Sequence, residues 1–166
     1  ANKIPNVNVD DILVSVRQAH LLVVMDQLTG DIKWSHRGNW IRQHDPDITA
    51  DGNIVVFNNG SQEFAFDRPS GSNLMMLDPS SNTSTVIYPK KGQQSFFSGI
   101  LGEQQLLNNG NYLITESRHG RAFEVSPEGE IVWDFVLPYD ETYASLIAVA
   151  RRYPLEYFTV DDWSCQ

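Results

Sequence analysis

The sequence predicts an all-β protein made of short antiparallel strands. Two observations carry this prediction. One pattern of three apolar, β-branched strands occurs three times, and its equivalent points Asp26, Asp78 and Ser126 follow one another at intervals of about 50 residues. The turns between strands read TGD, DGN, NGN and EGE, in which glycine supplies the positive φ of a tight turn. Short strands with such turns at this period are typical of β-propeller blades.

The repeats can be followed strand by strand. Trp34 and Trp133 both close a Gly-Asp/Glu-Ile-x-Trp motif, so we expect them to hold the same place in their blades and to pack in the core. The first repeat reads DILVSV, LLVVMD and TGDIKW, the second GNIVVFNN, NLMMLD and TSTVIY, and the third GNYLITES, RAFEVS and EGEIVWDF.

These repeats predict one partial propeller over residues 1–154 and a C-terminal tail over residues 155–166. Helix signals are few. The best is DETYASLIAVARRYP, which allows either a short helix that stops before Pro154 or a closing strand, LIAVARRY. The expected blades cover roughly residues 1–50, 51–108 and 109–154.

About three blades do not close a ring, because propellers typically have four to eight. An isolated half would expose two sheet edges and an apolar flank, which natural proteins avoid. The sequence begins at Ala1 without Met or a signal-peptide pattern, so the chain looks processed or cut from something longer. We therefore expect about half of a ring of roughly six blades. The rest would come from another chain, from an N-terminal part of the same precursor, or from a second copy.

Composition limits the partners. Twelve basic against 21 acidic residues give a net charge of −9, which disfavours nucleic acid and anionic membrane surfaces. A small anionic ligand stays compatible, because one arginine can dominate the charge of a pocket. Cys165 is the single cysteine, so no disulfide can form within the chain. It is either an inert thiol or, in an oxidising compartment, half of an interchain disulfide.

His44 is the first candidate for chemistry. It stands in RQHDPD and opens the first strand of a blade. The innermost strand of a blade lines the central channel, so a nucleophilic side chain at its entry reaches a ligand on the axis. Asp45 is a candidate to orient the ring. The alternative is a structural histidine, which is also our reading of the other three histidines.

Further candidates end the neighbouring strands. Arg17 closes DILVSVR, also a candidate innermost strand, and its guanidinium suits a sulfate, phosphate or carboxylate. Asn58 and Asn59 end NIVVFNN, where amides either cap a turn or contact a ligand. Ser117 and Arg121 stand in ITESRHGRAFEV, where the carboxylate of Glu116, between two arginines, is either part of an ion pair or a base near a pocket.

No pattern indicates a metal or a cofactor. The sequence has no H-x-H, no H-E-x-x-H and no cysteine cluster. It also lacks a glycine-rich phosphate loop after a strand and a G-x-S-x-G motif. We therefore expect chemistry that needs neither.

The ordered set DDILVSVR, TGDIKW, RQHDPDITADGNIVVFNNG and GNYLITESRHGRAFEVSPEGEIVWDFVLPY resembles the arylsulfotransferase family, over about residues 2–154. The resemblance implies a six-bladed propeller, periplasmic or secreted, which moves a sulfuryl group from an aryl sulfate to a phenol without a metal or a nucleotide donor.

The resemblance also implies roles for single residues. His44 matches the histidine that takes the sulfuryl group transiently, and Arg17 matches the arginine that ends the Ser-x-Arg strand. Asn2 falls where the family has the asparagine of a His-x-Asn element, whose histidine would precede Ala1. Arg17 and Asn2 would hold the sulfate oxygens, with Asn58, Asn59, Ser117 and Arg121 as further substrate-binding candidates.

Two classes of function follow. The first is sulfuryl transfer from an aryl sulfate to a phenolic acceptor through a sulfo-histidine, within a larger assembly that supplies the other blades. The second is a non-catalytic propeller fragment that binds a ligand or a protein. Hydrolysis of a sulfate ester or a lyase reaction in the same channel is a third reading, because fold does not fix function.

Overall fold

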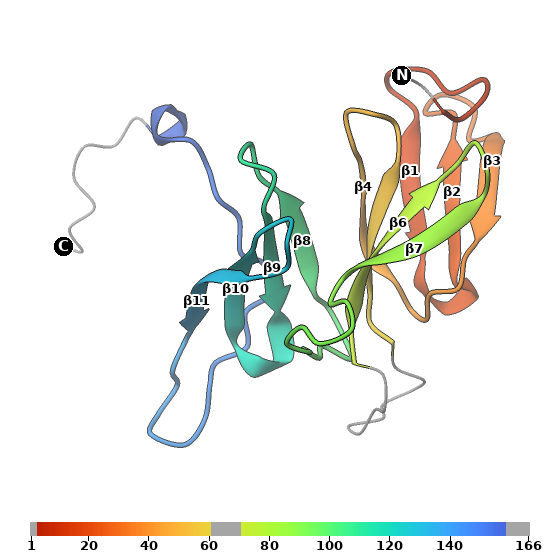
Figure 1. Cartoon of the computed structure of the whole chain (residues 1–166). Helices are drawn as coiled ribbons and strands as arrows, with labels where there is room; N and C mark the ends of the chain where they lie inside the picture. The colour runs from red at the N-terminus through yellow and green to blue at the C-terminus, as the bar shows by residue number, and fades with distance from the viewer. Residues whose placement is uncertain (1–2, 61–70, 159–166) are drawn as a thin grey trace.

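The computed structural model describes residues 3–60 and 71–158, and within them the chain is all-β. The strands form three antiparallel sheets that stand side by side, with the second between the other two (Figure 1). The predicted fold class is thereby confirmed. Asn2 and Cys165 lie outside the described residues, so their predicted roles stay predictions.

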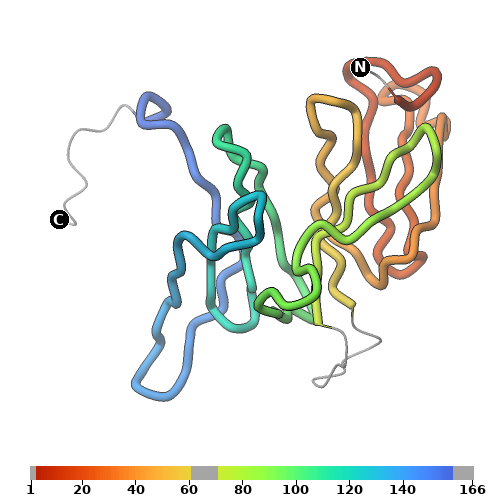
Figure 2. The backbone as a smooth tube through the Cα atoms, viewed as in Figure 1, coloured from red at the N-terminus to blue at the C-terminus, as the bar shows by residue number. Residues whose placement is uncertain are grey.

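The sheets follow one another along the chain, as the colour sequence of Figure 2 shows. Three 3₁₀ turns, η1 (Arg17–Ala19), η2 (Ser117–His119) and η3 (Leu155–Tyr157), are the only helical elements of the described residues. Sheet 1 contains β1 (Ile12–Val16), β2 (Leu21–Met25) and β3 (Ile32–Arg37); sheet 2 contains β4 (His44–Ile48), β5 (Ile54–Asn58), β6 (Asn73–Asp78) and β7 (Thr83–Tyr88); sheet 3 contains β8 (Glu103–Leu106), β9 (Tyr112–Glu116), β10 (Arg121–Val125) and β11 (Ile131–Val136).

Sheets 2 and 3 each have one strand more than the repeat predicted. The added strands are β4, with the sequence HDPDI, and β8, with EQQL. Both are polar, and β4 carries a bulge between His44 and Asp47, so neither shows the apolar pattern of the other strands. Each joins the sheet that follows it, so the sheet limits differ from the expected limits near residues 50 and 108.

This difference changes the place of β1. β1, β5 and β9 each pair with the strand that follows them, but β5 and β9 also pair with β4 and β8. β1 is therefore equivalent to the second strand of sheets 2 and 3. The expectation that DILVSV is an innermost strand is wrong. Its apolar alternation, shared with β5 and β9, marks the second strand of the repeat.

The core lies between neighbouring sheets. Between sheets 1 and 2 it consists of Ile4, Leu22, Val24, Trp40, Ile54, Val56, Met75 and Leu77. Between sheets 2 and 3 it consists of Phe57, Leu74, Tyr88, Phe96, Ile114, Phe123 and Val125. Successive residues of a strand point to opposite faces, so β5 and β6 supply both cores in alternation. Sheet 2 is thus buried on two faces, as a blade within a row of blades is.

Trp34 and Trp133 do hold the same register position, opposite Val24 and Glu124. Trp34 packs against the core between sheets 1 and 2. Trp133 lies on the face of sheet 3 that points away from sheet 2 and is 42% exposed. The prediction that both pack in the core is therefore wrong for Trp133, because the described chain places no further sheet on that face.

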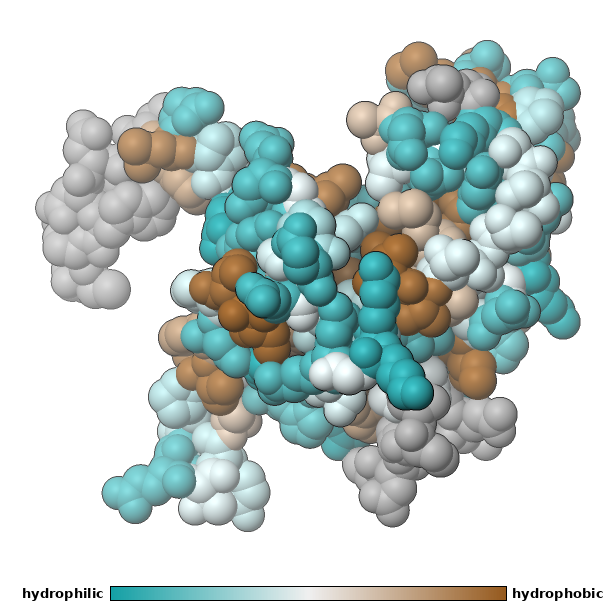
Figure 3. Space-filling model, in the orientation of Figure 1, coloured by the Kyte–Doolittle hydropathy of each residue, from teal (hydrophilic) through white to brown (hydrophobic). Residues whose placement is uncertain are grey.

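The two outer faces of the row are apolar. On sheet 1, Ile12 and Val14 occupy the register positions of Ile54 and Val56, which are buried in sheet 2, yet Ile12 is 47% exposed. On sheet 3, Trp133 and Phe135 lie on the outer face, opposite Glu124 and Ala122, and both are exposed. Figure 3 shows hydrophobic surface over the part of sheet 3 that carries β11.

The chain after β11 forms neither the predicted helix nor the predicted closing strand. It turns back and runs along sheet 3 in extended form up to η3 (Figure 2). Single hydrogen bonds hold it, from Ile147 N to Ser117 O and from Ala150 N to Thr115 Oγ1. The apolar residues of this segment have a spacing that allows a helix, but the hydrogen bonds to sheet 3 hold the segment in an extended conformation.

Candidate active site

The candidate site lies at the edge of the sheets where β5 and β9 end and β4 and β8 begin. His44 pairs with Phe57, and Glu103 pairs with Thr115. Phe57 and Thr115 hold the same place in β5 and β9, so His44 and Glu103 are equivalent first residues of the two added strands.

Three predicted site residues share one position of the repeat at this edge. Arg17, Asn59 and Ser117 each follow directly after β1, β5 and β9. The tertiary structure therefore brings the predicted candidates of three separate motifs to the same end of the three sheets. Only in sheet 2 does this position face a histidine.

The ring of His44 is held by its Nδ1 atom. Nδ1 lies 2.5 Å from Asn59 Oδ1 and 3.0 Å from the backbone oxygen of Arg42. Both partners accept hydrogen bonds, so Nδ1 carries the proton and donates it. The lone pair of the neutral ring is then on Nε2, to which no described residue makes a hydrogen bond. This tautomer has Nε2 as its nucleophilic atom.

Asn59 is fixed so that its oxygen faces the histidine. Its Nδ2 donates to the backbone oxygens of Ser98 and Leu101, each at 2.6 Å, and the side chain is fully buried. An amide with both N–H groups committed to carbonyls presents only its oxygen to the third neighbour. Asn59 is therefore a positioning residue for His44.

The backbone around His44 is unusual. Arg42 and Asp45 have φ values of 57° and 47°, and His44 stands between them. Non-glycine residues seldom adopt positive φ, and such conformations gather at functional sites. Arg42 N donates to His20 Nδ1 at 3.0 Å, which helps to hold the turn.

Two arginines approach each other near this turn. Burial lowers the pKa of Arg17, and the positive charge of Arg42 lowers it further. The two cations thus repel each other, and an anion between them would relieve that repulsion. Arg17 stands out in the sequence at a strand end, whereas Arg42, two residues before His44, carries no such signal.

Asp45 does not orient the histidine ring. Its Oδ2 accepts from Gln104 N at 2.7 Å, and its Oδ1 lies 3.2 Å from Arg151 Nη2. Burial raises the pKa of Asp45 to about 6, against the lowering effect of the Gln104 hydrogen bond and of Arg151. The ring-orienting role expected of Asp45 belongs to Asn59, because positive φ turns Asp45 toward sheet 3.

A small pocket opens beside His44. Its volume is about 160 Å³, and it lies between the starts of β4 and β8. This is below the usual volume for a drug-sized ligand, so it fits a small group. The lining residues are His44, Asp45, Leu101, Gly102, Glu103 and Ala148.

Three other predicted site residues make contacts within the fold, and their substrate-binding role stays a prediction. Asn58 Oδ1 accepts from Ile41 N at 2.8 Å and from Gly60 N at 3.1 Å, so this amide caps a turn. Ser117 Oγ accepts from Gly102 N at 3.0 Å and is fully buried. Arg121 forms ion pairs with Glu116 and Asp134, the first of the two alternatives that the sequence allowed.

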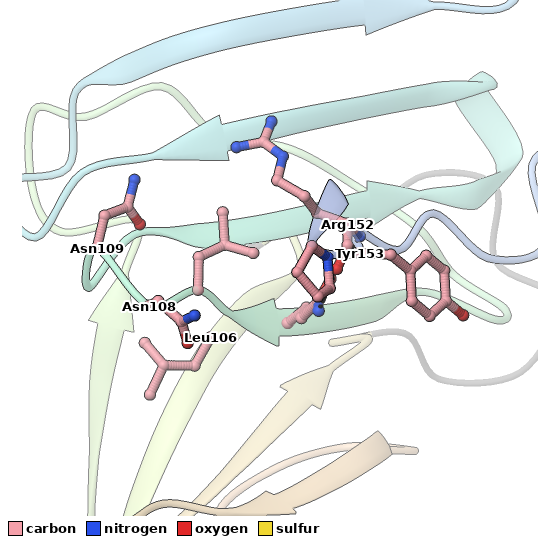
Figure 4. Close-up of a pocket in the computed structure, with 8 residues that line it drawn as sticks. Leu106, Asn108, Asn109, Arg152 and Tyr153 are labelled. Carbon is pink, nitrogen blue, oxygen red and sulfur yellow. Dashed lines mark hydrogen bonds between the residues drawn. The ribbon is translucent and has the colours of Figure 1, made fainter. Parts of the chain in front are cut away.

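A second pocket, of about 340 Å³, lies at the other end of sheet 3 (Figure 4). Leu106 lines it from the end of β8 and Asn109 from the β8–β9 turn, and Arg152 and Tyr153 line it from the chain after β11. Arg152 pairs with the buried Glu124, and Tyr153 stacks on Tyr157. These contacts bind the C-terminal segment to the sheet.

In residues 3–60 and 71–158, no three His, Cys, Asp or Glu side chains are grouped to hold a metal ion. Over the same residues, no helix has the length and apolar character needed to cross a membrane.

Comparison with known proteins identifies a family. The model of the arylsulfotransferase (ASST) family matches residues 1–137. No curated protein matches the chain. Among solved structures, a protein of unknown function from Bacteroides caccae is similar at 16% identity with a TM-score of 0.47. That similarity covers 75% of this chain and 41% of the other, so this chain spans less than half of that protein.

Proposed function

The chain belongs to the arylsulfotransferase family, and on this premise we propose that it carries the nucleophile of a sulfuryl transfer between phenolic oxygens. The observation that supports the proposal most is the hydrogen bonding of His44. Its Nδ1 donates to Asn59 Oδ1 and Arg42 O, which leaves the lone pair of Nε2 for attack.

The reaction has two steps. Nε2 of His44 attacks the sulfur of an aryl sulfate, the N–S bond forms, and the S–O bond to the aryl group breaks with its electrons on the leaving aryl oxide. In the second step an acceptor hydroxyl attacks the same sulfur, the N–S bond breaks, and the electron pair returns to Nε2. The acceptor proton leaves at this step. The product is a new aryl sulfate, and His44 is regenerated.

The arginines are proposed to stabilise the negative charge on the sulfuryl oxygens. A sulfuryl group carries negative charge on its oxygens throughout the transfer, and donors placed around those oxygens lower the barrier. Arg42 stands two residues before His44, and its positive charge lowers the pKa of Arg17. We assign sulfate binding to both, with Asn2 as a further candidate outside the described residues.

We further propose that additional sheets complete the site. The outer faces of sheets 1 and 3 carry apolar residues at positions buried between sheets elsewhere, such as Ile12 and Trp133. Such apolar outer faces are expected if further sheets cover them in a closed ring. Those sheets would come from another chain, from an N-terminal part of the precursor or from a second copy. A periplasmic or secreted location goes with the family resemblance. Native mass spectrometry of the particle distinguishes these three compositions.

The test uses the protein in its native assembly, with 4-nitrophenyl sulfate as donor and phenol as acceptor. His44→Ala should lower turnover by about 10³-fold or more, because the nucleophile is gone. His119→Ala is the matched control, since it removes a histidine after β9 that faces no equivalent of Asn59, and turnover should be kept. Labelled sulfuryl should appear on His44 in the wild type only.

Unchanged turnover in His44→Ala would exclude His44 as the nucleophile. Saturable binding of the aryl sulfate without turnover in the wild-type assembly would instead favour the non-catalytic binding function.

A further inference from the structure

The pocket beside His44 holds a second group that the proposed mechanism leaves unused. Glu103 is the first residue of β8, as His44 is of β4, and both line the same pocket. The repeat thus places a carboxylate in sheet 3 at the position where sheet 2 has its nucleophile.

The second step of the transfer needs a base. The acceptor hydroxyl must lose its proton as its oxygen attacks sulfur. His44 cannot take that proton, because Nε2 is bonded to sulfur and Nδ1 already carries a proton that it donates to Asn59. Another group at the pocket must therefore receive it.

Asp45 and Glu103 are the two carboxylates of the pocket, and their surroundings differ. Asp45 uses Oδ2 for the amide of Gln104 and Oδ1 for Arg151, so both oxygens serve structural contacts. Glu103 has one charged contact, from Oε2 to Arg151 Nη2 at 3.3 Å, and no hydrogen bond to Oε2 from the described residues. Oε2 itself is buried, whereas the Glu103 side chain as a whole is 25% exposed.

Arg151 positions Glu103 through an ion pair with Oε2. The same Nη2 atom lies 3.2 Å from Asp45 and 3.3 Å from Glu103, so one guanidinium is shared between two carboxylates. Ala148, three residues earlier in the same segment, closes the pocket wall. The chain after β11 thereby contributes both a wall and a positioning cation.

We propose that Glu103 accepts the proton of the acceptor hydroxyl in the second half-reaction, an inference that rests on the proposed function. The acceptor O–H bond breaks toward the carboxylate, its oxygen forms the S–O bond, and the N–S electron pair returns to His44 Nε2. Glu103 then releases the proton to water. The acceptor is a small phenol whose ring occupies the pocket between β4 and β8.

The test separates the two half-reactions of the native assembly. Release of 4-nitrophenol from 4-nitrophenyl sulfate without acceptor, as a burst of one equivalent per site, reports the first. Glu103→Gln should leave the size and rate of this burst unchanged within about twofold. With phenol, un-ionised at neutral pH, transfer from the sulfo-enzyme should slow by about 100-fold. With a dinitrophenol acceptor, already ionised, it should slow by less than about threefold.

The variant Glu130→Gln, on the β10–β11 turn of the same sheet, is the control and should change neither step. Should Glu103→Gln fail to fold, Glu103→Ala replaces it, and formate should restore transfer to phenol but not change transfer to dinitrophenol.

An equal loss for ionised and un-ionised acceptors would overturn the role of Glu103 while leaving the proposed function intact. No loss for either acceptor would do the same. The absence of any burst in the wild type would contradict the proposed function itself, and the inference with it.

Discussion

The two junctions between the sheets solve the same packing problem in opposite ways. At the junction of sheets 1 and 2, the residue before β4 is Gln43, and the facing residue of β1 is the small Ser15, whose Oγ hydrogen-bonds to the Gln43 amide at 3.0 Å. At the junction of sheets 2 and 3, the residue before β8 is Gly102, and the facing residue of β5 is the large Phe57. In both junctions a large side chain packs against a small residue. The large side chain precedes β4 at the first junction and lies in β5 at the second.

The exchange has a chemical consequence. Gln43 also donates to Leu21 O at 3.0 Å, so the first junction is fixed by polar contacts that hold the turn before His44. The second junction is fixed by the aromatic core. The strand arrangement is the same at both junctions, but the polar contacts are not. The junction of sheets 1 and 2, which has the polar contacts, is the one that precedes His44.

Gly102→Ala should break the second junction and have the largest effect. The new Cβ would overlap the ring of the fully buried Phe57, and φ at Gly102 is 94°, which alanine tolerates poorly. We expect a loss of about 4 kcal/mol in the free energy of unfolding, measured by urea denaturation.

Gln43→Ala is the matched change at the first junction. It creates a cavity in place of an overlap and removes two hydrogen bonds, so the loss should be about 2 kcal/mol. Equal losses at the two sites would contradict the exchanged packing.

Asn59→Ala should have a smaller effect than Gly102→Ala and a larger effect than Gln43→Ala. It removes the acceptor of His44 Nδ1 and leaves the backbone oxygens of Ser98 and Leu101 without their donor from Asn59. The free energy of unfolding should fall by about 3 kcal/mol. Turnover of the folded variant should fall by roughly 100-fold, because the ring is no longer held in one tautomer. A variant that folds and keeps full turnover would show that Asn59 does not position His44.

The pH dependence of stability should distinguish Asp45 from other carboxylates. Its pKa is about 6 in the folded chain against an ordinary 3.8, so the folded state holds this proton more tightly. Stability from this group is therefore present below pH 4 and lost as pH rises to about 6, by about 2 to 3 kcal/mol. The charged neighbours are Asp47 and Glu103, which raise the pKa, and Arg151, which lowers it.

The measurement compares urea midpoints at pH 4.5 and pH 7 in the wild type and in Asp45→Asn. The wild type should lose more stability between these values than the variant does. Burial lowers the pKa of His36 in both proteins, so the contribution of His36 cancels in the difference. Identical pH profiles would show that Asp45 ionises normally.

Ser117→Ala should have the smallest effect. It removes only the acceptor of Gly102 N, so we expect a loss of about 1 kcal/mol in the free energy of unfolding. Burst and transfer rates should stay unchanged, because Ser117 faces no catalytic ring. A loss of turnover as large as that of Asn59→Ala would show that Ser117, after β9, and Asn59, after β5, have equivalent functions.

Much of the fold was predictable because most strands carry it locally. β2, β5 and β10 alternate or concentrate β-branched and aromatic residues, and glycine with positive φ closes the turns at Gly52 and Gly110. β4 and β8 were not predictable in this way. Their residues are polar because they pair with a strand on one side only and face neighbouring side chains through hydrogen bonds.

The site was predictable in its members more than in their roles. His44, Arg17 and Asn59 stand out in the sequence as unusual residues at strand ends. Asp45 was expected to orient the ring, and Arg42 and Glu103 were missed. Neither the positive φ at Asp45 nor its contact with Gln104, about 60 residues away, can be read from the local sequence.

The all-β class, the repeat of about 50 residues and the polar residues at the strand ends follow from the amino-acid sequence, because strand periodicity and turn chemistry are local properties. Only the packing of the sheets shows which oxygen holds His44, which carboxylate shares its pocket and which tryptophan is covered. Those outcomes depend on how neighbouring sheets face each other, and that facing is set by side chains far apart in the chain.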